Sequence, residues 1–125
     1  MKLQILTAIA FLLLGAQTAL AQAQGDAKNG AAVFIQCKAC HSLDAGKNGI
    51  GPSLHGLFGR VSGTEPHYNY SDAMKKAAIA WSDETLFKYL TDPKAFVPGD
   101  KMPFPGVKDE QKRRDLIAYL KEATK

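Results

Sequence analysis

Two cysteines and a histidine stand together in the sequence and form its clearest pattern for chemistry. They belong to the pentapeptide Cys37-Lys38-Ala39-Cys40-His41, a CxxCH pattern. Two thiols at this spacing can form thioether bonds to the two vinyl groups of a haem, and the adjacent histidine is then held close to the iron. The pattern therefore predicts one covalently attached c-type haem (heme c). Cys37 and Cys40 are the expected attachment sites, and His41 is the expected iron ligand.

Two other uses of a CxxC pair compete with haem attachment. A thiol–disulfide oxidoreductase usually carries its pair beside a βαβ pattern, which this sequence lacks. A zinc site would use the pair as half of its ligands and complete them with His55 or His67. However, the chain has only two cysteines and the spacings fit no zinc finger. Haem attachment is the favoured hypothesis.

The second axial position of a haem iron decides between electron transfer and ligand chemistry. Outside the N-terminal segment the candidates are Met74 and Met102. Met74 lies in a short helical stretch beside two lysines, where ordinary packing is expected. Met102 lies within residues 98–105, where prolines stiffen the chain and lower the entropy lost in presenting a side chain. We therefore expect Met102 to be the second ligand.

Ligation by His41 and Met102 would leave the iron without an open site. A thioether sulfur favours ferrous iron and raises the reduction potential. This pair suits the transfer of single electrons and disfavours oxygen or peroxide chemistry. The rival function is a haem enzyme or gas sensor in which Met102 is loosely bound.

The N-terminal segment has the pattern of a secretory signal peptide. A lysine at position 2 is followed by an apolar run over residues 5–14 and then by small residues. A membrane span needs roughly 20 apolar residues, and this run is about half that length. We expect a signal peptide over residues 1–21, with cleavage after Ala21 or, alternatively, after Ala23. The mature domain is then 22–125 and its location periplasmic.

Composition limits the other functions of the chain. Sixteen Lys and Arg residues against twelve Asp and Glu give a net charge of +4, which the loss of the signal peptide reduces. Two haem propionates would reduce it further, so we expect no nucleic-acid partner. A domain of about 100 residues buries a modest share of its surface, and a bound cofactor would help it to fold.

Apolar residues at helical spacing predict an all-α domain with long loops. The first predicted helix has Asp26 as its N-cap and an apolar face formed by Ala27, Gly30, Ala31, Phe34 and Ile35. The last follows Asp109 and repeats the spacing at Leu116, Tyr119, Leu120 and Ala123.

Two further helices are expected between these ends. Ser82 can cap a helix over residues 83–90, with Trp81 and Leu86 as a hydrophobic staple and Pro93 as the stop. A shorter helix is expected after Ser71, through residues 73–78. No alternating strand pattern is present. Residues 43–69 and 93–105 are expected to be loops that wrap the cofactor.

The mature chain resembles the class I cytochromes c, which include mitochondrial cytochrome c and its bacterial periplasmic relatives. The resemblance covers nearly all of residues 22–125. It rests on the segments CKACH, GIGPSLHGLFGR, Tyr68-Asn69-Tyr70, LFKYLTDPKAF, PGDKM and DLIAYLKEAT. It implies a fold in which the first and last helices cross, at Gly30, Phe34, Leu116 and Tyr119. It also implies a monomeric electron carrier rather than an enzyme.

The resemblance also implies roles for individual residues. The Pro52 carbonyl would accept a hydrogen bond from the second ring nitrogen of His41, and the Tyr89 hydroxyl would point to the Met102 sulfur. The residues expected to bind the haem propionates are Arg60, Tyr70 and Trp81. The lysines expected to ring the haem edge and meet redox partners are Lys94, Lys101 and Lys108. Such partners are a cytochrome bc-type complex, an oxidase, a reaction centre, or a periplasmic reductase or dehydrogenase.

Two residues near the expected haem depart from the family pattern. Met74 stands where the family often has Asn near a propionate, and Asp100 replaces a frequent Thr. The first change removes a polar contact, and the second adds a possible negative charge.

Overall fold

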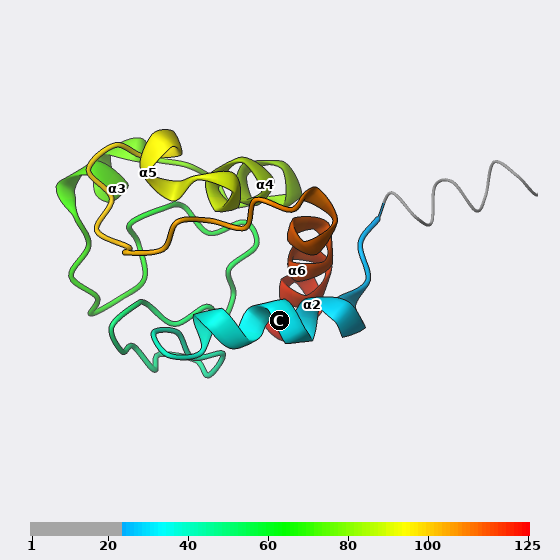
Figure 1. Cartoon of the computed structure of the whole chain (residues 1–125). Helices are drawn as coiled ribbons and strands as arrows, with labels where there is room; N and C mark the ends of the chain where they lie inside the picture. The colour runs from blue at the N-terminus through cyan, green and yellow to red at the C-terminus, as the bar shows by residue number, and fades with distance from the viewer. Residues whose placement is uncertain (1–23) are drawn as a thin grey trace, which may run out of the picture.

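The computed structural model describes residues 24–125 and is helical (Figure 1). Its elements in chain order are α2 (Ala27–Phe34), the 3-10 turn η1 (Ile35–Cys37), α3 (Asp72–Ala77), α4 (Asp83–Thr91), α5 (Pro93–Phe96) and α6 (Glu110–Ala123). Within this range the only sheet-like pairing is an isolated bridge between Val61 and Ala80. The predicted all-α class is confirmed.

The expected signal peptide, residues 1–21, and the alternative cleavage site after Ala23 lie outside the described residues. Among residues 24–125, no helix has the length and apolar character needed to cross a membrane.

Side-chain caps start the helices where the sequence predicts them. Asp26 accepts hydrogen bonds from the first backbone N–H groups of α2, and Asp109 does the same for α6. At α4, Ser82 and Thr85 form a reciprocal capping box. Ser71 caps α3, which ends at Ala77 because Ala78 adopts a left-handed conformation with φ of 49°.

Two local predictions are wrong. Ile35 was expected on the apolar face of the first helix, but its side chain is 64% exposed. Here α2 tightens into the turn η1, which has fewer residues per turn and carries Ile35 off that face. Residues 93–105 were expected to be loop throughout, but α5 begins at Pro93. Asp92 is extended and caps α5, and a proline is well suited to a first helical position.

The first and last helices cross, as the resemblance implies. Figure 1 shows α2 passing in front of α6. Phe34 and Leu116 are almost fully buried at the crossing, and the rings of Phe34 and Tyr119 lie 5.1 Å apart. A Cβ atom at Gly30 would overlap the backbone carbonyl of Asp115, so only glycine allows this close approach.

The crossing also involves a polar contact. The backbone N–H of Asp26 donates to the Asp115 carboxylate at 2.7 Å. These contacts fix α2 against the rest of the domain. They thereby fix the position of η1 and of Cys37 at its end.

Candidate functional site

A mainly apolar cavity of about 530 Å³ lies between the helices and the long loops. All nine residues predicted for the haem site line it: Cys37, Cys40, His41, Pro52, Arg60, Tyr70, Trp81, Tyr89 and Met102. Much of the remaining wall is aliphatic, from Leu54, Leu57, Leu86, Leu90, Leu116 and Leu120. The fold therefore brings together nine predicted residues, of which the first and last, Cys37 and Met102, are 65 positions apart in the sequence. The cavity suits a large, flat, apolar group with a polar edge.

A single turn of backbone places the attachment residues. The N–H of Cys40 donates to the Cys37 carbonyl at 3.2 Å, and the N–H of His41 donates to the same carbonyl at 2.9 Å. This turn continues η1, so both thiols reach the cavity and His41 follows directly. Burial, with a smaller contribution from Cys40, raises the pKa of the Cys37 thiol to about 11.

The structure disfavours both alternative uses of the cysteines. A thiol–disulfide enzyme needs a lowered cysteine pKa, whereas that of Cys37 is raised. For zinc, residues 24–125 contain no group of three or more His, Cys, Asp or Glu side chains that could hold a metal ion. His55 and His67 are exposed and do not line the cavity.

His41 is held by the loop that follows it. Its Nδ1 atom lies 2.8 Å from the Pro52 carbonyl oxygen, which can only accept a hydrogen bond. Nδ1 is therefore the protonated nitrogen, and Nε2 keeps its lone pair. Burial lowers the pKa of His41, a direction that the Pro52 bond partly opposes. A Cβ atom at Gly51 would overlap the imidazole ring, so glycine lets this loop approach closely.

The segment that carries Met102 is anchored through Asp100. The backbone N–H of Asp100 donates to the Val97 carbonyl at 3.0 Å, and the Lys94 ammonium donates to the Asp100 carbonyl, also at 3.0 Å. The Asp100 carboxylate accepts the N–H of Met102 at 3.0 Å. Asp100 is only 7% exposed.

The Tyr89 hydroxyl has two neighbours at the cavity wall. It lies 2.5 Å from Oδ2 of Asp100 and 3.9 Å from the Met102 sulfur. Burial, together with the Asp100 carboxylate, raises the pKa of Tyr89, so the phenol keeps its hydrogen. From the sequence, Asp100 was expected only to add a charge, and its role as the partner of Tyr89 was not predicted. Its position two residues before Met102 is the signal that could have indicated this role.

Met74 also lines the cavity and is 7% exposed. Its backbone carbonyl accepts a hydrogen bond from the Ser62 hydroxyl at 3.1 Å. Both candidate methionines therefore reach the same space. Burial alone does not choose between them.

A second polar cluster borders the cavity at Arg60. The guanidinium donates to Glu65 at 2.7 Å and to the Ser53 carbonyl at 2.9 Å. Both ionic side chains are largely buried, at 13% and 10% exposure. Glu65, which was not predicted from the sequence, partly neutralises the positive charge of Arg60.

Two further donors lie in this part of the wall. The Tyr70 oxygen accepts the N–H of Glu65 at 3.1 Å, and burial raises the pKa of Tyr70, so its own hydrogen is retained. Tyr70 and the buried Trp81 both line the cavity. A phenol hydroxyl and an indole N–H beside an apolar cavity suit an anionic acceptor such as a haem propionate.

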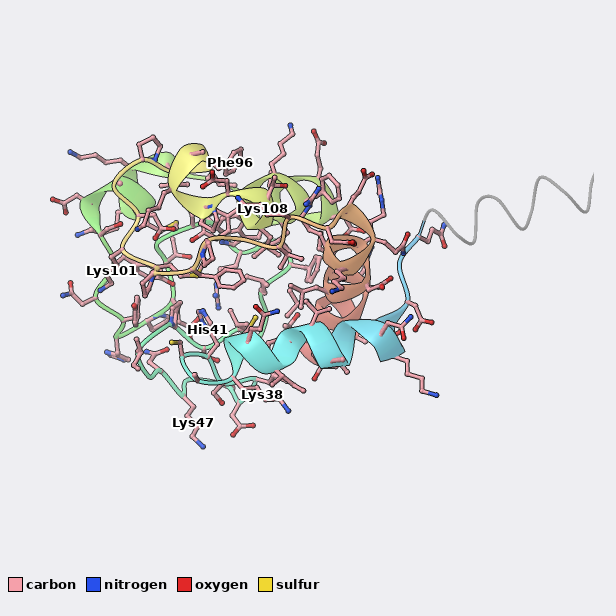
Figure 2. All side chains as sticks on the ribbon, in the orientation of Figure 1. Lys38, His41, Lys47, Phe96, Lys101 and Lys108 are labelled. Carbon is pink, nitrogen blue, oxygen red and sulfur yellow. The ribbon has the colours of Figure 1, made fainter. Side chains whose placement is uncertain are left out.

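The three predicted docking lysines are all exposed, but they differ in position. Lys101 lines the cavity and lies over the Tyr68 ring, with its ammonium 4.8 Å from the ring centre. Lys94 and Lys108 lie outside the cavity wall, and the Lys108 ammonium donates to the Thr91 carbonyl at 2.7 Å. Figure 2 shows Lys101 and Lys108 on the segment between α5 and α6.

Comparison with known proteins identifies the family of the chain. The family model described as cytochrome c matches residues 27–124. The chain is 54% identical to cytochrome c of Arabidopsis thaliana, over 82% of this chain and 93% of that protein. It is 55% identical to cytochrome c2 of Blastochloris viridis, over 88% and 87%. The solved structure of cytochrome cH from Methylobacterium extorquens matches with a TM-score of 0.73 and 48% identity, covering 78% of this chain and 98% of that one.

The fold, the CxxCH turn and the cavity that it faces define a helical haem protein of the c type. With these matches, the chain belongs to the cytochrome c family, with the class I all-α fold. It is therefore a haem-based electron carrier with one covalently attached c-type haem.

Proposed function

We propose that this cytochrome c is a periplasmic carrier of single electrons whose haem iron is ligated by His41 and Met102. The observation that carries the proposal is the convergence of an oriented imidazole and a tethered thioether on one apolar cavity. When bound, the haem supplies an iron that alternates between the ferric and ferrous states.

His41 supplies the first ligand atom. The hydrogen bond from Nδ1 to the Pro52 carbonyl fixes both the tautomer and the ring orientation, and it raises the basicity of Nε2. Cys37 and Cys40 provide the thioether links from the same turn. One short segment, residues 37–41, therefore supplies both thioether links and the first iron ligand.

Met102 supplies the second ligand atom. Its backbone is tied to Asp100, whereas the Met74 backbone belongs to the short helix α3. A ligand on a braced segment loses little entropy on binding and returns to the same position after each electron transfer. Aliphatic side chains around it exclude water, which limits the reorganisation that accompanies a change of charge.

Polar side chains at one part of the cavity wall would stabilise the negative charge of the haem propionates. We propose that Tyr70 and Trp81 donate hydrogen bonds to the propionates and that Arg60 contributes part of its positive charge. Glu65 reduces the net charge that Arg60 offers, since the pair is close and largely buried. This arrangement supports the binding of the group and requires no reaction from these side chains.

Redox proteins are the proposed partners, docking where Lys101 borders the cavity, with Lys94 and Lys108 nearby in the sequence. The candidates are the membrane complexes and periplasmic enzymes already named. We propose that the chain acts as a monomer and binds no nucleic acid.

Replacing Met102 tests the ligand assignment. Met102→Ala should abolish the weak sulfur-to-iron charge-transfer band of the ferric protein. It should also lower the potential by on the order of 0.1 V or more, since axial ligands tune haem potentials over about 0.8 V. Met74→Leu, a volume-conserving control, should retain the band. If Met102→Ala leaves spectrum and potential unchanged, the assignment is wrong.

The mature N-terminus tests the proposed export. Protein isolated from the periplasmic fraction should begin at Gln22 or Gln24 and carry covalent haem after acid-acetone extraction. Intact Met1 on haem-loaded protein in the cytoplasm would contradict the proposed location.

Salt dependence tests the docking surface. The rate of association with an acidic redox partner should fall as ionic strength rises, because exposed charges steer the encounter. Lys101→Glu should weaken both the rate and its salt dependence, whereas Lys125→Glu, at the C-terminus, should change them little. Equal effects of the two variants would argue against docking at Lys101.

A further inference from the structure

We propose that Asp100 is a positioning residue for the iron ligand Met102. Its carboxylate holds the backbone of the ligand segment and takes the hydrogen of the Tyr89 hydroxyl, which leaves the Met102 sulfur without a hydrogen bond. This inference rests on the proposed ligation by Met102. It changes the role that the family resemblance implies for Tyr89, whose hydroxyl was expected to serve the sulfur.

The two carboxylate oxygens of Asp100 have separate partners. Oδ1 accepts the N–H of Met102 at 3.0 Å, and Oδ2 accepts the Tyr89 hydroxyl at 2.5 Å. One side chain therefore joins the ligand segment to helix α4, eleven residues away. Both oxygens of the side chain therefore act as acceptors, one toward each partner.

The Asp100 carboxylate and the Met102 sulfur compete for the one hydrogen of the Tyr89 hydroxyl. A tyrosine hydroxyl can donate only once, and a thioether sulfur is a weak acceptor. Hydrogen bonds from O–H to a carboxylate are short, about 2.5–2.7 Å, and roughly twice as strong as neutral ones. The contact of Tyr89 with Asp100 falls in that range, whereas its distance to the Met102 sulfur is 3.9 Å. The Tyr89 hydroxyl therefore donates its hydrogen to Asp100 rather than to the Met102 sulfur.

Asp100 is itself held in place. Its backbone N–H is bonded to Val97 and its carbonyl to the Lys94 ammonium, and the residue is buried. These bonds fix the backbone from which the carboxylate reaches Tyr89 and Met102. A sulfur that receives no hydrogen bond keeps its lone-pair density for the iron.

A double-mutant cycle on the haem-loaded protein tests this role. The readout is the position of the sulfur-to-iron charge-transfer band, which reports on the sulfur itself. Asp100→Ala should shift the band, because the Tyr89 hydroxyl is then free to donate to the sulfur. Tyr89→Phe alone should barely move it. The double variant should return the band to its original position, since the donor is gone.

The outcomes separate this inference from the proposed function. If the unaltered protein shows no such band, the ligation by Met102 fails and the inference fails with it. If the band is present but Asp100→Ala leaves it in place, only the inference is overturned. A shift with Tyr89→Phe alone as large as that with Asp100→Ala would also overturn it.

If the Asp100→Ala variant does not take up haem, a measurement on the reduced, unaltered protein tests the same hydrogen bond. Proton NMR should show the Tyr89 hydroxyl proton far downfield, as expected of a short bond to a carboxylate. The signal should be missing from Tyr89→Phe. A Tyr89 hydroxyl proton without that downfield shift would contradict capture of the hydrogen by Asp100.

Discussion

The hydrogen bond from Nδ1 of His41 to the Pro52 carbonyl is the contact on which the rest of the site depends. The CxxCH turn places two thiols and an imidazole together, but it does not orient the imidazole. The loop at Pro52 does so, and Gly51 lets it come close enough. This arrangement holds only if the turn itself is fixed. The crossing of α2 with α6 at Gly30 fixes it, so a helix contact outside the cavity wall helps to position His41.

The cofactor and the core of this domain occupy the same space. Leucines that would pack against one another in an ordinary helical domain instead line a cavity of about 530 Å³. Helices α3, α4 and α5 are short, and long loops connect them. In a domain of this size the bound haem therefore completes the hydrophobic core as well as carrying the electron. Two hydrogen-bonded polar clusters, at Arg60 and at Asp100, border this mainly apolar cavity.

Much of this was predictable from the sequence because the signals are local. Asp26, Ser82 and Asp109 cap helices through neighbouring backbone groups, and the CxxCH spacing defines a turn. The exposed position of Ile35 was not predictable, because it follows from a change of helix type. The pairs Tyr89–Asp100 and Arg60–Glu65 depend on how loops fold over the cavity, and no periodicity encodes that. The residues that the family resemblance implies line one cavity, but the resemblance does not reveal these two carboxylate partners.

The central claim is that both axial positions of the iron are filled by side chains of this chain. Adding carbon monoxide to the reduced protein tests it most directly. With His41 and Met102 both bound, the spectrum of the reduced protein should stay unchanged at neutral pH, and a redox titration should show one reversible one-electron step. Rapid formation of a carbon monoxide adduct would show an open site. It would favour a haem enzyme or gas sensor over an electron carrier.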